Sequence, residues 1–195
     1  ISKYRLNSRK NSRAFFNYPV QQVKKSASRM PDMGIKTFFF SNVCSAIRKD
    51  VFQNMKGFPE GVIMNEDLLF AAKVIRDGQS IAYVPEAQVL HSHNYGFFRQ
   101  FRRYFDIGVC FRDNKEALDG VTVGNEGMKF VIEEFRYLCT QRHFGWLPYS
   151  ALELMCRYGG FVCGKSYTIF PAVVKKQMSL HRNYWDCRTS ASRRT

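Results

Sequence analysis

The 195-residue chain contains no apolar run that approaches the roughly 20 residues needed to cross a bilayer. It also shows no signal-peptide pattern at its start, so we expect a protein that does not span a membrane. Cysteine occurs only at six scattered positions without Cys-x-x-Cys spacing, which indicates neither a zinc site nor a secreted disulfide framework. Reduced thiols in a cytoplasm are the simpler interpretation.

Acidic residues are scarce as well. The chain has 16 Asp and Glu against 30 Lys and Arg, which gives a net charge of +14. Its N-terminal part is a polycation, interleaved with Tyr and Phe, up to the first acid, Asp32. A charge of this size predicts an anionic partner. Three kinds of partner qualify: a phosphorylated small molecule or lipid, an anionic membrane surface, and nucleic acid.

Nucleic acid belongs to a different functional class, that of a basic adaptor domain without catalysis. Aromatic residues among basic ones can stack bases and neutralise phosphates, which keeps this alternative open. The sequence shows no RNA-recognition signature, no helix-turn-helix pattern and no zinc-finger spacing. Nucleic acid is therefore the less favoured partner.

Two adjacent carboxylates, Glu66 and Asp67, begin a predicted helix. Asn65 can cap this helix, apolar residues recur at helical spacing after it, and Gly78 ends it. Unpaired backbone N–H groups in a first helical turn favour negative charge. The pair is suited to proton abstraction, and an acidic helix start that only complements the dipole is the competing interpretation.

Two short extended runs follow, Ile81–Val84 and Ala87–Leu90, with Pro85 between them. The second run delivers His91 and His93 to one face of a strand, because alternate residues of a strand point the same way. Two imidazoles on one face can bind a metal or contact an anion. A single histidine at a strand end is more often structural.

Together with their neighbours, these segments resemble the family 2 glycosyltransferases, and more closely their bacterial rhamnosyltransferase-like members. The matching segments are Phe38–Phe52, Gly57–Glu60, Asn65–Asp67, Pro85–Ala87, His91–Tyr95 and Arg102–Gly108. They occur in the family's order and at about its spacing. The resemblance implies an α/β fold, the C-terminal half of a Rossmann-like glycosyltransferase A (GT-A) fold, followed by a helical extension.

The resemblance also implies site residues. Asp67 matches the catalytic base, Glu66 lies beside it, and His91 matches a histidine that completes a metal site. The candidates for substrate binding are Asn42, Ser45 and His93. The first two follow a predicted strand at Phe38–Phe40, where a turn can present them to the acceptor.

No Asp-x-Asp motif occurs in the sequence, although this family uses one to hold Mg²⁺ or Mn²⁺ against the donor diphosphate. The chain also begins at Ile1 rather than at a methionine. We therefore expect the acceptor-side part of a longer inverting enzyme, inactive in isolation. The resemblance implies transfer of a sugar, such as L-rhamnose from dTDP-rhamnose, to a surface polysaccharide or lipid-linked glycan. A cytoplasmic location follows, with peripheral attachment to the inner face of the plasma membrane as a hypothesis.

The rest of the chain has helical patterns. We predict a helix from about Gly96 that Gly108 can interrupt, a second from Met128 to about Arg142, and a third that ends at Gly159–Gly160. In the second helix, we expect one buried face and three solvent-exposed charged residues. The buried face comprises Phe130, Val131, Phe135, Leu138 and Cys139, and the solvent-exposed residues are Glu133, Glu134 and Arg136.

The predicted organisation has three parts: residues 1–112 as the acceptor-side part of the GT-A domain, 113–187 as a helical extension, and 188–195 as a disordered basic tail. Trp and Tyr residues in the extension, close to Lys and Arg, favour attachment to anionic lipid. Each aromatic residue taken alone is better explained by packing.

Overall fold

The computed structural model describes residues 19–87, 89, 95–121 and 124–192. They form two compact units. The first takes the described residues of Ile1–Phe58, Asp67–Asn94 and Ala117–Ser150, and the second those of Pro59–Glu66, Tyr95–Glu116 and Ala151–Thr195. This division does not coincide with the boundary predicted between residues 112 and 113, because residues on both sides of it belong to the second unit.

The strands in the described part of the chain are β1 (Val23–Lys25) and β2 (Ile81–Tyr83). They pair antiparallel in the first unit, with Val23 opposite Tyr83. β2 confirms the first predicted extended run, whereas Ala87 and Val89 of the second run lie outside any strand. A two-stranded sheet does not test the expected GT-A core, which stays a prediction.

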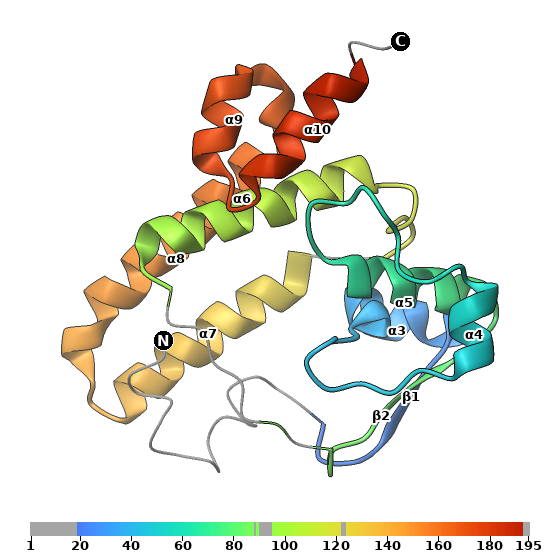
Figure 1. Cartoon of the computed structure of the whole chain (residues 1–195). Helices are drawn as coiled ribbons and strands as arrows, with labels where there is room; N and C mark the ends of the chain where they lie inside the picture. Colours follow the sequence, from blue (N-terminus) through green and yellow to red (C-terminus); the bar gives the residue numbers. More distant parts are fainter. Residues whose placement is uncertain (1–18, 88, 90–94, 122–123, 193–195) are drawn as a thin grey trace. The chain divides into compact units, whose positions relative to one another are not determined.

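Helices make up most of the regular structure (Figure 1). In chain order, with η for a 3₁₀ helix, they are η1 (Ala27–Arg29), α3 (Met30–Met33), η2 (Gly34–Phe38), α4 (Lys49–Asn54), α5 (Glu66–Arg76), α6 (Phe97–Asp113), α7 (Gly124–Thr140), η3 (Phe144–Trp146), α8 (Leu147–Lys165), η4 (Tyr167–Ile169), α9 (Ala172–Met178) and α10 (Arg182–Ser192). α5, α6 and α7 confirm the helices predicted at these places.

The strand predicted at Phe38–Phe40 is wrong, because η2 ends at Phe38 and neither Phe39 nor Phe40 lies in a strand. Ile35 and Phe38 are three residues apart, so their side chains lie on one side of a 3₁₀ helix. Both are buried, with 2% and 0% of their surface exposed. Burial of this pair outweighs the strand preference of three consecutive phenylalanines.

The core of the first unit holds α5 in place. Its buried centre consists of Met55, Phe70 and Val74, and the residues packed against it are Ile47, Val51, Phe52, Phe58 and Ile81. The ring of Phe58 contacts that of Phe70 with centroids 5.0 Å apart and that of Phe52 at 5.4 Å. Gly57 precedes Phe58 with a φ of 71°, a left-handed conformation that glycine adopts without strain. This turn brings Phe58 onto α5.

In the second unit, α6 crosses α8 through glycine contacts. A Cβ at Gly160 would overlap the carbonyl oxygen of Phe101, and one at Gly164 would overlap that of Phe105. Gly108 likewise meets the backbone of α8. The predicted interruption at Gly108 and the predicted helix end at Gly159–Gly160 are therefore wrong, because these glycines permit a close backbone approach rather than ending a helix.

Trp185, which is only 4% exposed, packs the C-terminal part of the second unit against the rest of that unit. Its ring contacts those of Tyr184, Tyr167 and Phe105 at 5.3, 5.4 and 6.2 Å between centroids. α10 continues to Ser192, so the disordered tail predicted from residue 188 is helical up to that point. Residues 193–195 lie outside the described part of the chain.

α7 buries a different face from the one predicted. Leu138 is fully buried as expected, but Phe135 is 59% exposed and Glu134 is only 6% exposed. Glu134 and Leu138 are four residues apart and therefore lie on the same side of the helix. In the residues that the structure describes, no helix combines the length and apolar character needed to cross a membrane.

Candidate functional site

Asp67 lies in the first turn of α5 with a half-buried side chain. Its Oδ1 accepts a hydrogen bond from the backbone N–H of Leu68 at 2.8 Å, and its Oδ2 accepts one from the backbone N–H of Asn42 at 3.3 Å. A carboxylate offers about four acceptor positions, so these two bonds orient the group and leave lone pairs available for a proton. Glu66, the first residue of the helix, is also half-buried.

Asn42 and Ser45 are exposed in the loop between η2 and α4. A turn forms there, in which the backbone N–H of Cys44 donates to the carbonyl oxygen of Ser41 at 3.3 Å. The structure brings Asn42 to Asp67 through its backbone, as noted above. No hydrogen bond joins Ser45 to either carboxylate in the described residues, so a role for Ser45 stays a prediction.

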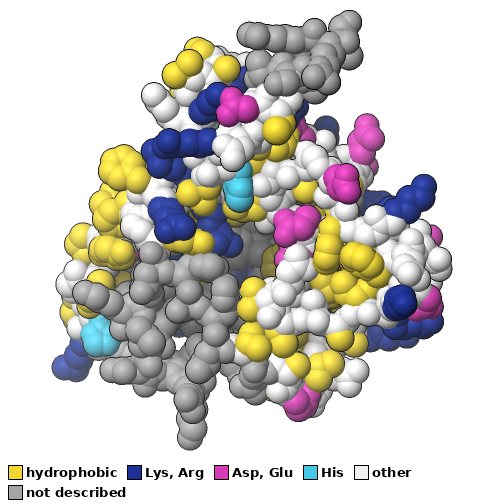
Figure 2. Space-filling model, viewed as in Figure 1, with side chains coloured by type: hydrophobic (Ala, Val, Ile, Leu, Met, Phe, Trp, Pro, Cys, Tyr) yellow, Lys and Arg dark blue, Asp and Glu magenta, His cyan; other side chains and the backbone are white. Residues whose placement is uncertain are grey.

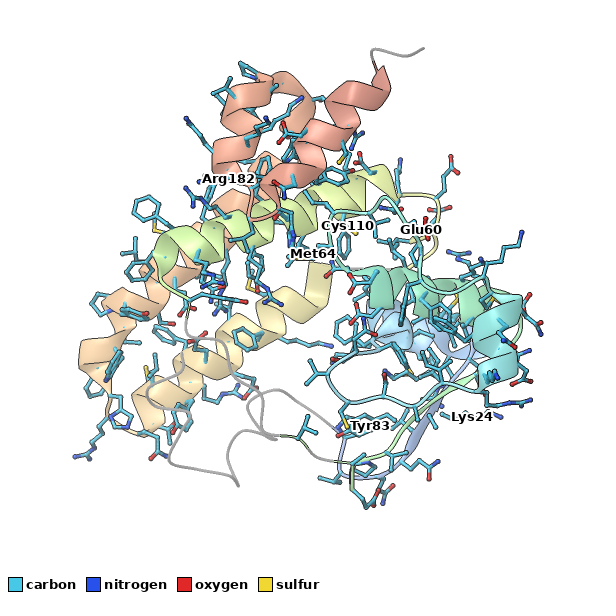
Figure 3. The ribbon with its side chains drawn as sticks, in the orientation of Figure 1. Lys24, Glu60, Met64, Tyr83, Cys110 and Arg182 are labelled. Atoms are coloured by element: carbon cyan, nitrogen blue, oxygen red, sulfur yellow. The ribbon has the colours of Figure 1, made fainter. Side chains whose placement is uncertain are left out.

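Asn65, predicted as the cap of α5, has a φ of 61°, outside the β region that capping residues usually adopt. Its side chain lies near the thiol of Cys110 on α6 and interacts with it electrostatically. Burial raises the pKa of Cys110 to about 12, so this thiol is protonated at neutral pH and is a poor nucleophile. Figure 3 labels Cys110 and Met64, where this loop meets α6.

The predicted metal and substrate contacts of His91 and His93 fall on residues outside the described part of the chain. Among the residues that are described, no three His, Cys, Asp or Glu side chains gather closely enough to hold a metal ion. The described residues therefore do not form a centre for Mg²⁺ or Mn²⁺ by themselves.

One buried carboxylate was missed by the sequence analysis. Asp106 on α6 is fully buried, and its Oδ2 accepts hydrogen bonds from the backbone N–H groups of Leu180 at 2.9 Å and His181 at 3.2 Å. Burial raises the pKa of Asp106. Asp106 thereby anchors the segment that leads into α10. The sequence did contain a signal for this residue, since Asp106 stands between the apolar Phe105 and Ile107 in an aromatic helix. A carboxylate buried at such a place requires specific hydrogen-bond partners.

A pocket of about 450 Å³ lies in the second unit. Its lining consists of Val62 and Ile63, from the loop before α5, and of the segment from Leu180 to Tyr184 at the start of α10. No pattern in the sequence had predicted that these two segments meet.

Comparison with known proteins confirms the predicted resemblance: the chain is similar to part of two O-antigen chain rhamnosyltransferases. It is 37% identical over 174 residues to the O-antigen chain rhamnosyltransferase RfbN of Salmonella typhimurium strain LT2. It is 38% identical over 172 residues to the O-antigen chain rhamnosyltransferase WbaN of Salmonella anatum.

Each of these alignments covers 88% of this chain but 54% of the relative, so the chain spans about half the length of the curated relatives it matches. No protein-family model matches the sequence, and no solved structure does.

Proposed function

We propose that this segment serves an enzyme that transfers L-rhamnose from dTDP-rhamnose to a hydroxyl of a growing surface polysaccharide or lipid-linked glycan, with inversion at the anomeric carbon. The similarity to two O-antigen rhamnosyltransferases along 88% of the chain supports the reaction class. The structural observation that carries the chemistry is the Asp67 carboxylate, oriented by the N–H groups of Leu68 and Asn42.

In the proposed reaction, Asp67 accepts the proton of the acceptor hydroxyl while the hydroxyl oxygen bonds to the anomeric carbon. The bond from that carbon to the nucleoside diphosphate breaks on the opposite side, and its electron pair leaves with the diphosphate. The two backbone hydrogen bonds limit the rotation of the carboxylate, which keeps a free lone pair available for the acceptor. Glu66, the neighbouring residue, is proposed to orient the acceptor.

Mg²⁺ or Mn²⁺ remains part of the proposal for the complete enzyme, in which it would neutralise charge on the departing diphosphate. The described residues do not form such a centre, so no step of the mechanism is assigned to the metal here. The GT-A fold and a cytoplasmic location also stay proposals that rest on the resemblance.

A chimaera tests the proposed function. The matching segment of the Salmonella typhimurium relative is replaced by this chain, and transfer of radiolabelled rhamnose from dTDP-rhamnose to the lipid-linked acceptor is measured. We expect transfer, with the anomeric configuration inverted in the product by NMR. A folded chimaera, judged by its unfolding transition, that transfers no rhamnose would contradict the proposal.

A second proposal is attachment of the segment to an anionic membrane surface. The exposed apolar residues of α8 include Leu154, Met155, Tyr158 and Val162, which are 37%, 68%, 69% and 42% exposed. Their spacing places them along one side of the helix. Figure 2 shows hydrophobic side chains gathered on the surface in this region.

Charge supports the same partner, because basic residues outnumber acidic ones among the described residues of the second unit. Lys165 ends α8 next to the apolar residues, and Lys175 and Lys176 follow on α9. Each basic residue near an anionic lipid surface contributes about 1 kcal/mol of attraction.

A further inference from the structure

We propose that the pocket of the second unit binds a phosphate or diphosphate ester, with Arg182 as the anion-binding side chain. The inference rests on the proposed function and deepens it, since a nucleotide sugar and a lipid-linked acceptor both carry this chemical group. Three observations support it: the residues that line the pocket, the absence of partners for Arg182 and Asn183 among the described residues, and the uncompensated charge of Arg182.

The lining of the pocket is mostly polar. Val62 and Ile63 form one side, and the other side consists of the apolar Leu180 and the polar His181, Arg182, Asn183 and Tyr184. Pockets that bind small molecules usually have volumes of about 300–1,000 Å³. A volume of about 450 Å³ therefore accommodates a diphosphate together with part of the group it carries.

Two of the lining side chains have no partner within the described chain. The guanidinium of Arg182 and the amide of Asn183 make neither a hydrogen bond nor an ion pair with any described residue. Most other arginines of the second unit do have partners. Arg157 pairs with Glu153, and Arg188 with Asp113. Arg182, labelled in Figure 3 at the start of α10, is thus available to a ligand.

The position of Arg182 is electrostatically unfavourable for the protein alone. It is the first residue of α10, where the helix dipole favours negative charge and disfavours a cation. Among the described residues, the buried carboxylate of Asp106 accepts hydrogen bonds from the backbone N–H groups of Leu180 and His181, and not from Arg182. A bound phosphate would compensate the charge of Arg182 and accept hydrogen bonds from its guanidinium.

The pocket is held in a fixed shape by contacts behind its lining. Tyr184 accepts a hydrogen bond from Nη1 of Arg188 at 2.8 Å, and its ring contacts Trp185. On the other side, Ile63 is only 5% exposed and precedes Glu66 by three residues in the same unit. Three residues span at most about 11 Å of extended chain. Ile63 on the pocket wall therefore lies within about this distance of Glu66, which belongs to the same unit.

The test uses the full chain and measures binding rather than turnover. Three probes are titrated by calorimetry at low salt: pyrophosphate, dTDP and farnesyl diphosphate. We expect pyrophosphate to bind and the affinity to fall about tenfold or more in Arg182→Gln, because a charge-assisted hydrogen bond is lost. Lys115→Gln is the matched control, because it removes the same charge from an exposed residue that lies in the same unit but outside the pocket.

The probes separate the two sources of the diphosphate. Tighter binding of dTDP than of pyrophosphate assigns the pocket to the nucleotide sugar, and tighter binding of farnesyl diphosphate assigns it to a lipid-linked acceptor. The proposal is overturned if none of the three binds at millimolar concentration, or if Arg182→Gln and Lys115→Gln reduce affinity equally. An inactive chimaera would contradict the proposed reaction but would leave these binding results unchanged. A failure of the proposed reaction can therefore be distinguished from a failure of the proposed phosphate site.

Discussion

The backbone N–H of Asn42 donates a hydrogen bond to Oδ2 of Asp67, at 3.3 Å, across 25 residues of sequence. The bond joins the loop after η2 to the first turn of α5, and it is made by the backbone of Asn42. Its strength therefore does not depend on which side chain stands at position 42. The loop positions the carboxylate, and Asn42 itself is exposed.

The first prediction concerns Asp67 in the active chimaera. Asp67→Asn removes the proposed proton acceptor but keeps the size of the side chain, so kcat should fall by about 10² or more. Asp77→Asn, just beyond the other end of α5, is the control and should keep kcat within about twofold, since surface substitutions of this kind change little. Steady-state kinetics with dTDP-rhamnose give both values. Near-normal turnover of Asp67→Asn would remove this residue from the mechanism.

The start of α5 could be predicted from sequence because its information is local. Leu68, Leu69, Ala72 and Ile75 recur at helical spacing, and all are buried in the structure. The partner of Asp67 could not be predicted in the same way. Asn42 reaches it only because the residues before and after the loop are packed into the core of the first unit, and no local pattern encodes that approach.

Glycine shows the same limit in the second unit. In a single sequence, Gly108 and Gly160 weaken a helix, and we therefore predicted an interruption at Gly108 and a helix end at Gly159–Gly160. The structure instead uses them where α6 and α8 approach so closely that no side chain fits. Only the facing helix distinguishes these two roles of glycine. Asp106 is a similar case, because its partners at Leu180 and His181 lie more than 70 residues away.

The second prediction tests the crossing of α6 and α8. Gly160→Ala should lower the free energy of unfolding by about 1–3 kcal/mol, because its methyl group would overlap the carbonyl oxygen of Phe101. Gly159→Ala is the matched control. Its Cβ would lie 3.8 Å from the ring of Phe101, an ordinary contact, so it should stabilise the helix by about 0.5–1 kcal/mol. Urea denaturation measures both, and equal effects at the two positions would contradict the close crossing.

The third prediction concerns Lys25, whose Nζ donates a hydrogen bond to the carbonyl oxygen of Phe39 at 2.6 Å. Burial, with repulsion from Lys36, lowers the pKa of Lys25 from 10.5 to about 8. Between these values the unfolded chain binds more protons than the folded one, so the free energy of unfolding should rise as pH increases from about 8 to about 10.5. The rise attributable to Lys25 is at most about 3 kcal/mol.

Lys25→Met isolates this contribution, because other Lys and Tyr residues titrate in the same range. Urea denaturation gives the free energy of unfolding of both proteins across this pH range. The value for the original chain minus that for the variant should rise as pH increases from about 8 to about 10.5. If the free energies of unfolding of the variant and of the original chain changed in parallel with pH, folding would not lower the pKa of Lys25.

The fourth prediction tests the membrane surface proposed for α8. In a flotation assay, the chain should float with vesicles rich in anionic lipid at low salt and be released at high salt, since salt screens the attraction of its basic residues. Replacing Met155, Tyr158 and Val162 together by Gln should abolish flotation, because these exposed residues supply the apolar contact. Val20→Gln with Val84→Gln is the control, since it removes exposed apolar residues of the first unit.

Two outcomes of this assay decide against the proposal. Either the unaltered chain ignores anionic vesicles at low salt, or the α8 and control variants float equally well. In both cases the exposed residues of α8 would not form a lipid-binding face. Retention of single-stranded nucleic acid by the same chain, with a steep dependence on salt, would then favour the alternative of a basic adaptor, because neutralised phosphates release counterions on binding.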